Sequence, residues 1–150
     1  MFFELTVSIR RPPAEVFAFL RDKDIYPQEP DSPVLLLEKT TPGAPGVGTC
    51  YREVVKMLPF YQGEIVSTLT RFEPYEYLEE DFRGAGMHGH LAYQFIQEPG
   101  GTLLIQRETL HYQGLLRLFE PVIRVFLYRR LRERLADIKS ILESGYKVVV

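Results

Sequence analysis

The sequence lacks features that several broad classes of protein need. It contains one cysteine, Cys50, so no disulfide can form within the chain, and it contains no tryptophan. A membrane-spanning helix needs about 18 or more consecutive apolar residues, and the chain has no such run and no segment resembling a secretory signal peptide. Eighteen basic and twenty acidic residues give a net charge of −2, which excludes an overall basic surface for nucleic acid. We therefore expect a cytoplasmic protein with no nucleic-acid partner.

The composition is typical of one globular domain. Of 150 residues, 45% are hydrophobic, 25% are charged, and the 11 glycines and 11 prolines are dispersed. We find no internal repeat or linker, and we expect a single domain over residues 1–150.

Hydrophobic periodicity predicts strands before helix. Residues 1–9 alternate between apolar and polar side chains, which is typical of a half-buried strand, and Pro12-Pro13 suits the first turn of a short helix containing Val16, Phe17 and Leu20. Residues 22–33, rich in proline and acidic residues, are predicted to be irregular or to form at most one more helical turn. Turn signals about every ten residues favour an antiparallel meander, with strands predicted at 34–39, 49–58, 64–72, 75–82, 88–97 and 102–112.

From Leu115 the period becomes helical. Apolar residues at steps of three and four, namely Leu131, Leu135, Ile138 and Leu142, predict one buried stripe on a helix that ends at Gly145. Pro121 indicates either a kink or the true first turn. Residues 115–128 are apolar nearly all round, so we expect them to cover more than one sheet face.

The turn at Glu98-Pro99-Gly100-Gly101 predicts a hairpin in which Gln97 faces Thr102. This register places the larger apolar side chains on one face, which we assign inward, together with Tyr93, Gln106 and Glu108. A buried carboxylate or amide is costly unless it is hydrogen-bonded. The partner of Glu108 could be a ligand, a water molecule, a buried arginine or another side chain, and Glu108 could also lie near a strand end.

Three tempting motifs have simpler interpretations. Residues 84–89 read G-x-G-x-x-G, but a strand-like segment follows where a nucleotide site needs a helix, so we interpret them as a hairpin loop. His88, His90 and His111 share the face assigned to solvent, and we interpret them as surface residues without a metal. No nucleophile motif occurs, so hydrolytic chemistry is unsupported, and we expect no cofactor. Seven basic against four acidic residues in 115–144, together with Phe119, Phe126 and Tyr128, could form a membrane-surface helix, but a solvated face of a packed helix is the simpler interpretation, and we expect no membrane contact.

The order of elements and four short motifs resemble the SRPBCC or START-like helix-grip superfamily, which includes birch-pollen-allergen-like and polyketide cyclase/dehydrase-like proteins. The motifs are the opening segment 7–17, Phe72-Glu73-Pro74, Gly100-Gly101-Thr102 and the segment 138–143. The resemblance implies an α+β fold in which a curved antiparallel sheet of six to seven strands wraps around a long C-terminal helix, with two short helices after the first strand. It also implies that residues 115–128 border an apolar pocket between sheet and helix. A solid core or a dimer contact is the alternative.

The leading hypothesis is therefore a protein, monomeric or homodimeric, that binds a hydrophobic or amphipathic small molecule as a carrier or sensor. The candidate ligand-binding residues are Tyr51, Phe60, Leu91, Tyr93, Leu104, Gln106, Glu108, Leu110, Tyr112, Phe119, Ile123 and Phe126. One alternative is a cyclase/dehydrase-like enzyme in which Glu108 moves a proton, and another is an interaction module without a ligand.

Overall fold

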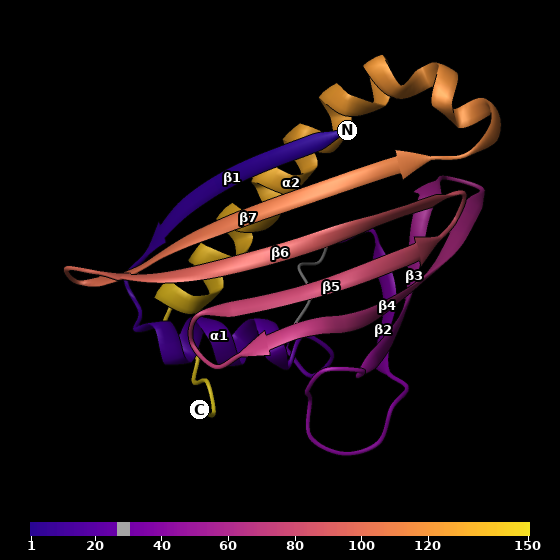
Figure 1. Cartoon of the computed structure of the whole chain (residues 1–150). Coiled ribbons are helices and arrows are strands. Elements are labelled where there is room, and N and C mark those ends of the chain that lie inside the picture. Colours follow the sequence, from indigo (N-terminus) through magenta and orange to yellow (C-terminus); the bar gives the residue numbers. More distant parts are fainter. Residues whose placement is uncertain (27–30) are drawn as a thin grey trace.

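The computed structural model describes residues 1–26 and 31–150, apart from the side chains of residues 57 and 58. It contains one antiparallel sheet whose strands lie in the order β1-β7-β6-β5-β4-β3-β2 (Figure 1). The elements are β1 (Phe2–Ile9), α1 (Pro13–Arg21), β2 (Val34–Lys39), β3 (Cys50–Leu58), β4 (Tyr61–Glu73), β5 (Tyr77–Gly84), β6 (Met87–Glu98), β7 (Gly101–Tyr112), a 3₁₀ helix η1 (Gly114–Phe119) and α2 (Glu120–Glu143).

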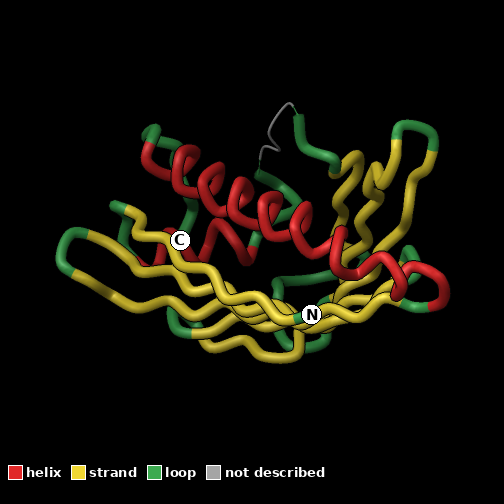
Figure 2. Tube along the Cα trace, turned by 90° about the horizontal axis from the view of Figure 1, so that it is seen from above, coloured by secondary structure: helices red, strands yellow, loops and turns green. Residues whose placement is uncertain are grey.

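The helix-grip expectation is confirmed. All the predicted strands are present, and the sheet curves so that β2 and β3 rise on the same side as α2 (Figure 2). The second short helix expected after β1 is not seen in the part of the chain that the structure describes. Residues 22–25 form a turn in which the Ile25 amide donates to the Asp22 carbonyl, and residues 27–30 lie outside the described residues.

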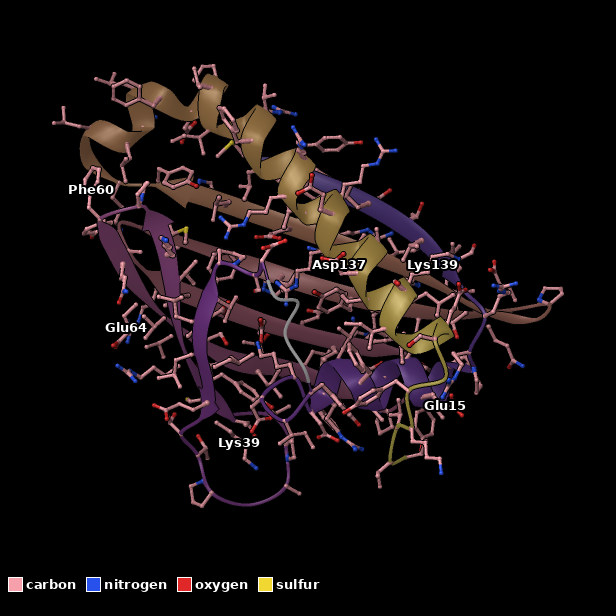
Figure 3. All side chains as sticks on the ribbon, turned by 180° about the vertical axis from the view of Figure 1, so that it is seen from behind. Glu15, Lys39, Phe60, Glu64, Asp137 and Lys139 are labelled. Atoms are coloured by element: carbon pink, nitrogen blue, oxygen red, sulfur yellow. The ribbon has the colours of Figure 1, made fainter. Side chains whose placement is uncertain are left out.

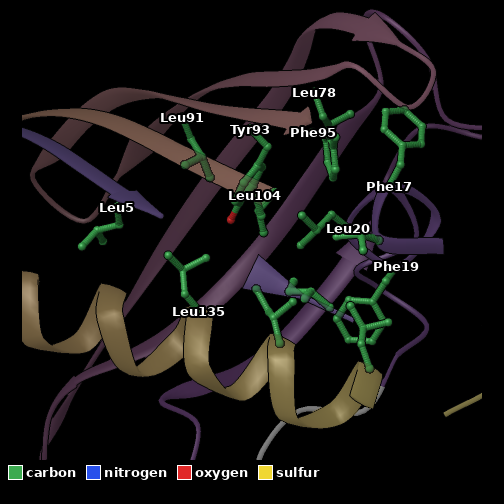
Figure 4. Packing of buried hydrophobic residues seen from close by; sticks show 14 of the residues in the cluster. Leu5, Phe17, Phe19, Leu20, Leu78, Leu91, Tyr93, Phe95, Leu104 and Leu135 are labelled. Atoms are coloured by element: carbon green, nitrogen blue, oxygen red, sulfur yellow. The ribbon is translucent and has the colours of Figure 1, made fainter. Parts of the chain in front are cut away.

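The hydrophobic core includes the region where α1 meets the sheet and the C-terminal half of α2. Pro13 occupies the first turn of α1, and the run Val16 to Leu20 is buried. The Phe17 ring meets Phe72 and Phe95 edge to face, each at a centroid distance of 5.3 Å. Figure 4 shows Phe17, Phe19, Leu20 and Phe95 among the buried side chains between α1, the sheet and α2.

Helix α2 is buried along only half of its length. Pro121 lies in its first turn, and its buried residues are the four predicted from the periodicity: Leu131, Leu135, Ile138 and Leu142. The N-terminal half contacts the sheet at its β1 edge, where the rings of Tyr128 and Phe3 have centroids 6.4 Å apart. This half therefore crosses the edge strand instead of covering the centre of the sheet (Figures 1 and 2).

The β6–β7 register is the predicted one. Gln97 pairs with Thr102 and His88 with His111, while Leu91, Tyr93 and Leu104 are buried on the face toward α2. The G-x-G-x-x-G segment forms the β5–β6 turn, in which Ala85 and Gly86 adopt positive φ angles of 50° and 75°. The hairpin interpretation of that motif is therefore correct.

We predict that Leu142→Ala lowers the free energy of unfolding by about 2–5 kcal/mol, because it removes a fully buried side chain at the junction of α2 with the core. Val125→Ala is the matched control on the same helix. It should change stability by less than about 0.5 kcal/mol, since Val125 is exposed. Urea unfolding followed by circular dichroism measures both values, and equal effects would contradict the packing described above.

Candidate functional site

A small polar pocket lies between α2, the turn after α1 and the concave face of the sheet. We call it the Tyr93 pocket; its lining residues are Leu20, Arg21, Lys23, Tyr51, Leu69, Leu78, Glu80, Tyr93 and Arg134. Its volume is about 10 Å³, which is room for about one water molecule. Unlike the core beside α1, it combines apolar side chains with charged and hydroxyl groups.

One side of the pocket is internally satisfied. The Lys23 ammonium lies 2.7 and 2.9 Å from the two carboxylate oxygens of Glu80 and 4.6 Å from the centre of the Tyr51 ring. The Tyr51 hydroxyl donates a hydrogen bond of 3.0 Å to the Arg21 carbonyl. These contacts hold the end of α1 and the turn after it against β3 and β5, so the turn forms a fixed side of the pocket.

The other side carries polar atoms without partners. The Tyr93 hydroxyl and Gln106 Oε1 are buried, and neither has a hydrogen-bond partner among the described residues. Figure 4 shows the Tyr93 hydroxyl pointing away from the sheet toward α2, among Leu91, Leu104 and Leu135. Burial raises the pKa of Tyr93 to about 12, so the hydroxyl keeps its proton and can donate a hydrogen bond. Buried polar atoms in native structures nearly always have a protein or water partner, so this pair calls for an explanation.

Glu108 is the neighbour of these atoms. Its carboxylate accepts a hydrogen bond of 3.1 Å from Gln106 Nε2, so the partner left open by the sequence is an amide on the same strand. Burial raises the pKa of Glu108 above its ordinary value, against the opposing effects of the Arg134 charge and of this hydrogen bond. Glu108 is thus a carboxyl group that is more readily protonated than a surface glutamate.

Arg134 lies on α2 over the pocket. It borders the pocket, is exposed to solvent, and makes no hydrogen bond or ion pair with the residues that the structure describes. Tyr93 in its ionised form, followed by the carboxylates of Glu53, Glu108 and Glu80, raises the pKa of Arg134, while burial opposes the increase. The positive charge of the guanidinium is therefore stabilised by the negative groups of the concave face at a distance, without a hydrogen bond or ion pair to any of the described residues.

Arg130 lies one turn before Arg134 on α2. Burial lowers its pKa despite the solvent-exposed surface of the residue, and Glu53 opposes this effect. The surrounding protein therefore partly desolvates this second guanidinium as well.

The residues predicted from the sequence separate into two groups. The structure brings Tyr51, Tyr93, Gln106 and Glu108 together at or beside the pocket, and Leu91, Leu104 and Leu110 are buried on the same face of the sheet. The others lie nearer the η1 end of the molecule: Tyr112 and Ile123 are half-buried, whereas Phe60, Phe119 and Phe126 are exposed. The apolar first half of the helix therefore does not enclose a pocket in the described part of the chain.

Three residues of the pocket were not predicted from the sequence: Lys23, Glu80 and Arg134. The pairing of Glu80 with Leu91 puts Glu80 on the inward face, and extending the hairpin register to β5 would have found it. Arg134 stands three residues after Leu131, beside the buried stripe, so its position on the helix was available from the periodicity. The sequence pattern gave no indication that Lys23 lies in the pocket, because this residue follows the helix in an irregular segment.

Two other places were considered as sites, and the first is the histidine group. The rings of His88 and His111 stack on the solvent face at 5.3 Å, and His90 turns toward Asp81 instead, with 2.7 Å between Nδ1 and Oδ1. Within residues 1–26 and 31–150 no group of three or more histidine, cysteine, aspartate or glutamate side chains is placed to hold a metal ion.

The second is a broad depression of about 430 Å³ by the β4–β5 turn; it is lined by Pro13, Tyr75, Glu76, Tyr77, Gln94, Phe95, Ile96 and Gln97. The side-chain amide of Gln94 in this depression already has hydrogen-bond partners: it donates to the Tyr77 hydroxyl and accepts from Arg107. The Tyr93 pocket is therefore the stronger candidate.

Solved structures of several proteins share the fold. A protein from Thermus thermophilus superposes with a TM-score of 0.77 at 14% identity, covering 98% of this chain and all (100%) of that one. Ara h 8.0201 gives 0.73 at 16% identity, covering 97% and 99%, and a Deinococcus radiodurans protein gives 0.63 at 20%, covering 97% and 100%. At these identities the likeness concerns the fold alone.

None of the described helices is long and apolar enough to cross a membrane.

Among curated protein sequences, none matches the chain at a significant level. The sequence model of the family described as "Polyketide cyclase / dehydrase and lipid transport", however, matches residues 3–143. Because that match spans nearly the whole chain and agrees with the observed helix-grip fold, the protein belongs to this polyketide cyclase/dehydrase and lipid transport family.

Proposed function

We propose that the protein binds an amphipathic small molecule whose polar head reaches the Tyr93 pocket. The observation that carries the proposal is the pair of buried polar atoms, Tyr93 Oη and Gln106 Oε1, that have no partner among the described residues. One is a donor and the other an acceptor, so they match a head group that both accepts and donates hydrogen bonds, such as a protonated carboxylic acid or a hydroxyketone. Burying each atom unpaired costs about 1–3 kcal/mol, which a bound head group would recover.

The apolar part of the ligand would lie along α2. One face of α2 carries Ile123, Phe126, Arg130 and Arg134, which are spaced by three and four residues, and Phe119 ends η1 immediately before the helix. This face changes from apolar near η1 to cationic over the pocket. A ligand bound along it would place its head under Arg134 and its tail toward η1.

Entry of the head requires Arg134 to move, because the pocket now has room for about one water molecule. Arg134 is exposed and forms no hydrogen bond or ion pair with the described residues, so its displacement breaks no such contact. In the displaced position its guanidinium would remain available to an anionic or carbonyl oxygen of the ligand.

Native mass spectrometry of gently purified protein tests the proposal. We expect a population that carries an additional small-molecule mass, or one that acquires it with cis-parinaric acid, a fluorescent fatty acid. The absence of both a retained mass and saturable binding of that probe would contradict the proposed function.

A pair of tyrosine variants provides a sharper test. Tyr93→Phe removes a buried hydroxyl without a partner, so we expect the free energy of unfolding to stay equal or to rise by about 1–3 kcal/mol, while cis-parinaric acid binds about three- to tenfold more weakly. Tyr51→Phe removes a buried hydroxyl that donates to Arg21, so we expect it to lose about 1 kcal/mol of stability. Thermal unfolding and fluorescence titration measure both variants. Equal destabilisation by the two would show that the Tyr93 hydroxyl has an ordinary structural role.

A second candidate is catalysis of the cyclase/dehydrase kind. The observation that favours it is Glu108, a buried carboxyl group with a raised pKa beside the unpartnered atoms. In such a reaction Glu108 would give or take a proton on a ligand whose carbonyl oxygen is held by Tyr93. A Glu108→Gln variant that keeps probe binding but loses turnover of a polyketide-like substrate would favour this candidate over simple binding.

The raised pKa of Glu108 also predicts a pH dependence. As pH rises above the ordinary glutamate pKa of 4.5, the unfolded chain ionises at this position before the folded chain does, which favours unfolding. We expect Glu108→Gln to gain stability relative to the native chain as pH rises through the folded-state pKa of Glu108. Melting temperatures of both proteins across that range measure the difference. A difference that does not change with pH would show that Glu108 ionises as readily in the folded chain as in the unfolded one.

A further inference from the structure

The end of the molecule near η1 exposes an unusual number of large apolar side chains. We call this group the apolar rim; its members, each 58–88% exposed, are Phe60, Leu115, Leu118, Phe119, Val122, Val125 and Phe126. It combines two separate segments of the chain, since Phe60 lies in the β3–β4 turn and the other residues lie on η1 and the first turns of α2. Figures 1 and 3 place the β3–β4 turn and η1 at the same end of the molecule. Large groups of exposed apolar side chains at one end of a protein often mark an interaction surface.

Positive charge accompanies the apolar rim. Residues 115–134 contain six arginines and two glutamates, a local net charge of +4, whereas the whole chain has a net charge of −2. Arg129 and Arg132 follow Val122 and Val125 at steps of three and four residues and so share their face of α2. Among the described residues, one ion pair involves this stretch: it joins Arg129 to Glu133 at 2.9 Å, and both side chains are exposed.

We propose that the apolar rim docks on the surface of an anionic lipid bilayer. With a rise of about 1.5 Å per residue, Arg129 and Arg132 lie roughly 6 and 10 Å along the helix from Val125. Apolar residues of interfacial segments reach about 5–10 Å into the boundary between the head groups and the acyl chains. With the η1 end inserted to this depth and the axis of α2 steep to the bilayer, these arginines would lie at the level of the lipid phosphates. Phe60, on the other element, would enter the same layer. The proposal replaces the expectation, drawn from the sequence, of a solvated helix face without membrane contact.

A second copy of the chain is a poorer occupant. A symmetric dimer buries the same patch from both subunits, so each arginine-rich surface would face its own copy. Like charges at close range oppose such contact, whereas anionic lipids neutralise them. The proposal goes beyond ligand binding and does not depend on it, because it concerns exposed residues at the end of the molecule and not the Tyr93 pocket.

Vesicle flotation tests the proposal with the full chain. We expect the protein to float with vesicles that contain phosphatidylserine together with phosphatidylcholine, and to bind pure phosphatidylcholine vesicles at least about tenfold more weakly. Raising the salt concentration should reduce the binding further. Equal binding to both lipids, or none to either, would overturn the proposal.

Matched variants identify the surface. Val125 and Val47 are 69% and 70% exposed, and only Val125 belongs to the apolar rim, so Val125→Ser should weaken flotation while Val47→Ser leaves it unchanged. Adding Phe60→Ser and Phe126→Ser to Val125→Ser should reduce partitioning about tenfold or more. Replacing Arg129 and Arg132 by Gln should cost about fivefold for each arginine, on phosphatidylserine vesicles only. Equal effects of Val125→Ser and Val47→Ser would overturn the assignment to this surface.

Analytical ultracentrifugation separates the competing occupant. A monomer in the absence of vesicles agrees with the proposal. A stable dimer that Val125→Ser dissociates would show that a second copy covers the apolar rim, and would overturn it. The proposed ligand site is tested independently, because cis-parinaric acid binding in the absence of vesicles should respond to Tyr93→Phe and not to Phe60→Ser.

Discussion

The attachment of α2 to the sheet through its C-terminal half determines most of what this molecule presents to its surroundings. Leu131, Leu135, Ile138 and Leu142 join the core formed by α1 and the sheet, and no residue of η1 or of the preceding turns of α2 is buried to the same degree. A helix is stiff on this scale, so fixing one end determines the course of the other. The first turns therefore cross the β1 edge, and the residues that could cover the outer part of the sheet remain exposed (Figure 2).

The same constraint explains why the polar atoms of the concave face are arranged as they are. At the α1 end, where packing is complete, buried polar groups have partners, as with the Tyr51 hydroxyl and Thr102, whose hydroxyl donates to the Arg11 carbonyl. Toward the middle of the sheet the helix supplies Arg134, which is exposed, and Tyr93 and Gln106 keep atoms without partners among the described residues. A chain selected for stability alone could place Phe and Leu at these two positions. Keeping Tyr and Gln there has a cost that binding would offset, and this is the main physical argument for a ligand.

The fold was largely predictable because its determinants are local. Alternation and turn residues indicated the strands, the Pro99-Gly100 turn set the β6–β7 register, and this register alone placed Tyr93, Gln106 and Glu108 on one face. The site was only partly predictable, because Lys23 and Arg134 reach it from segments whose position depends on tertiary packing. The exposure of Phe119 and Phe126 was not predictable either. An all-round apolar helix indicates burial, but the sequence does not specify whether the protein itself or another phase covers it.

The two proposals meet on one face of α2. From Phe119 through Ile123 and Phe126 to Arg134 the side chains of this face change from apolar to cationic, so two members of the apolar rim lie at one end of a stripe whose other end is the Tyr93 pocket. An amphiphile aligned with this stripe has its head group at the Tyr93 pocket and its tail toward the apolar rim. A lipid that left a bilayer with its head group first would arrive in this orientation. A bilayer docked on the apolar rim would exclude water from the tail of the ligand. Meanwhile its head group would leave its contacts with the neighbouring lipid head groups and bind Arg134 and Tyr93. If both proposals hold, the apolar residues that remain unburied in the free protein would act in uptake, because they would let the ligand pass without exposing its tail to water.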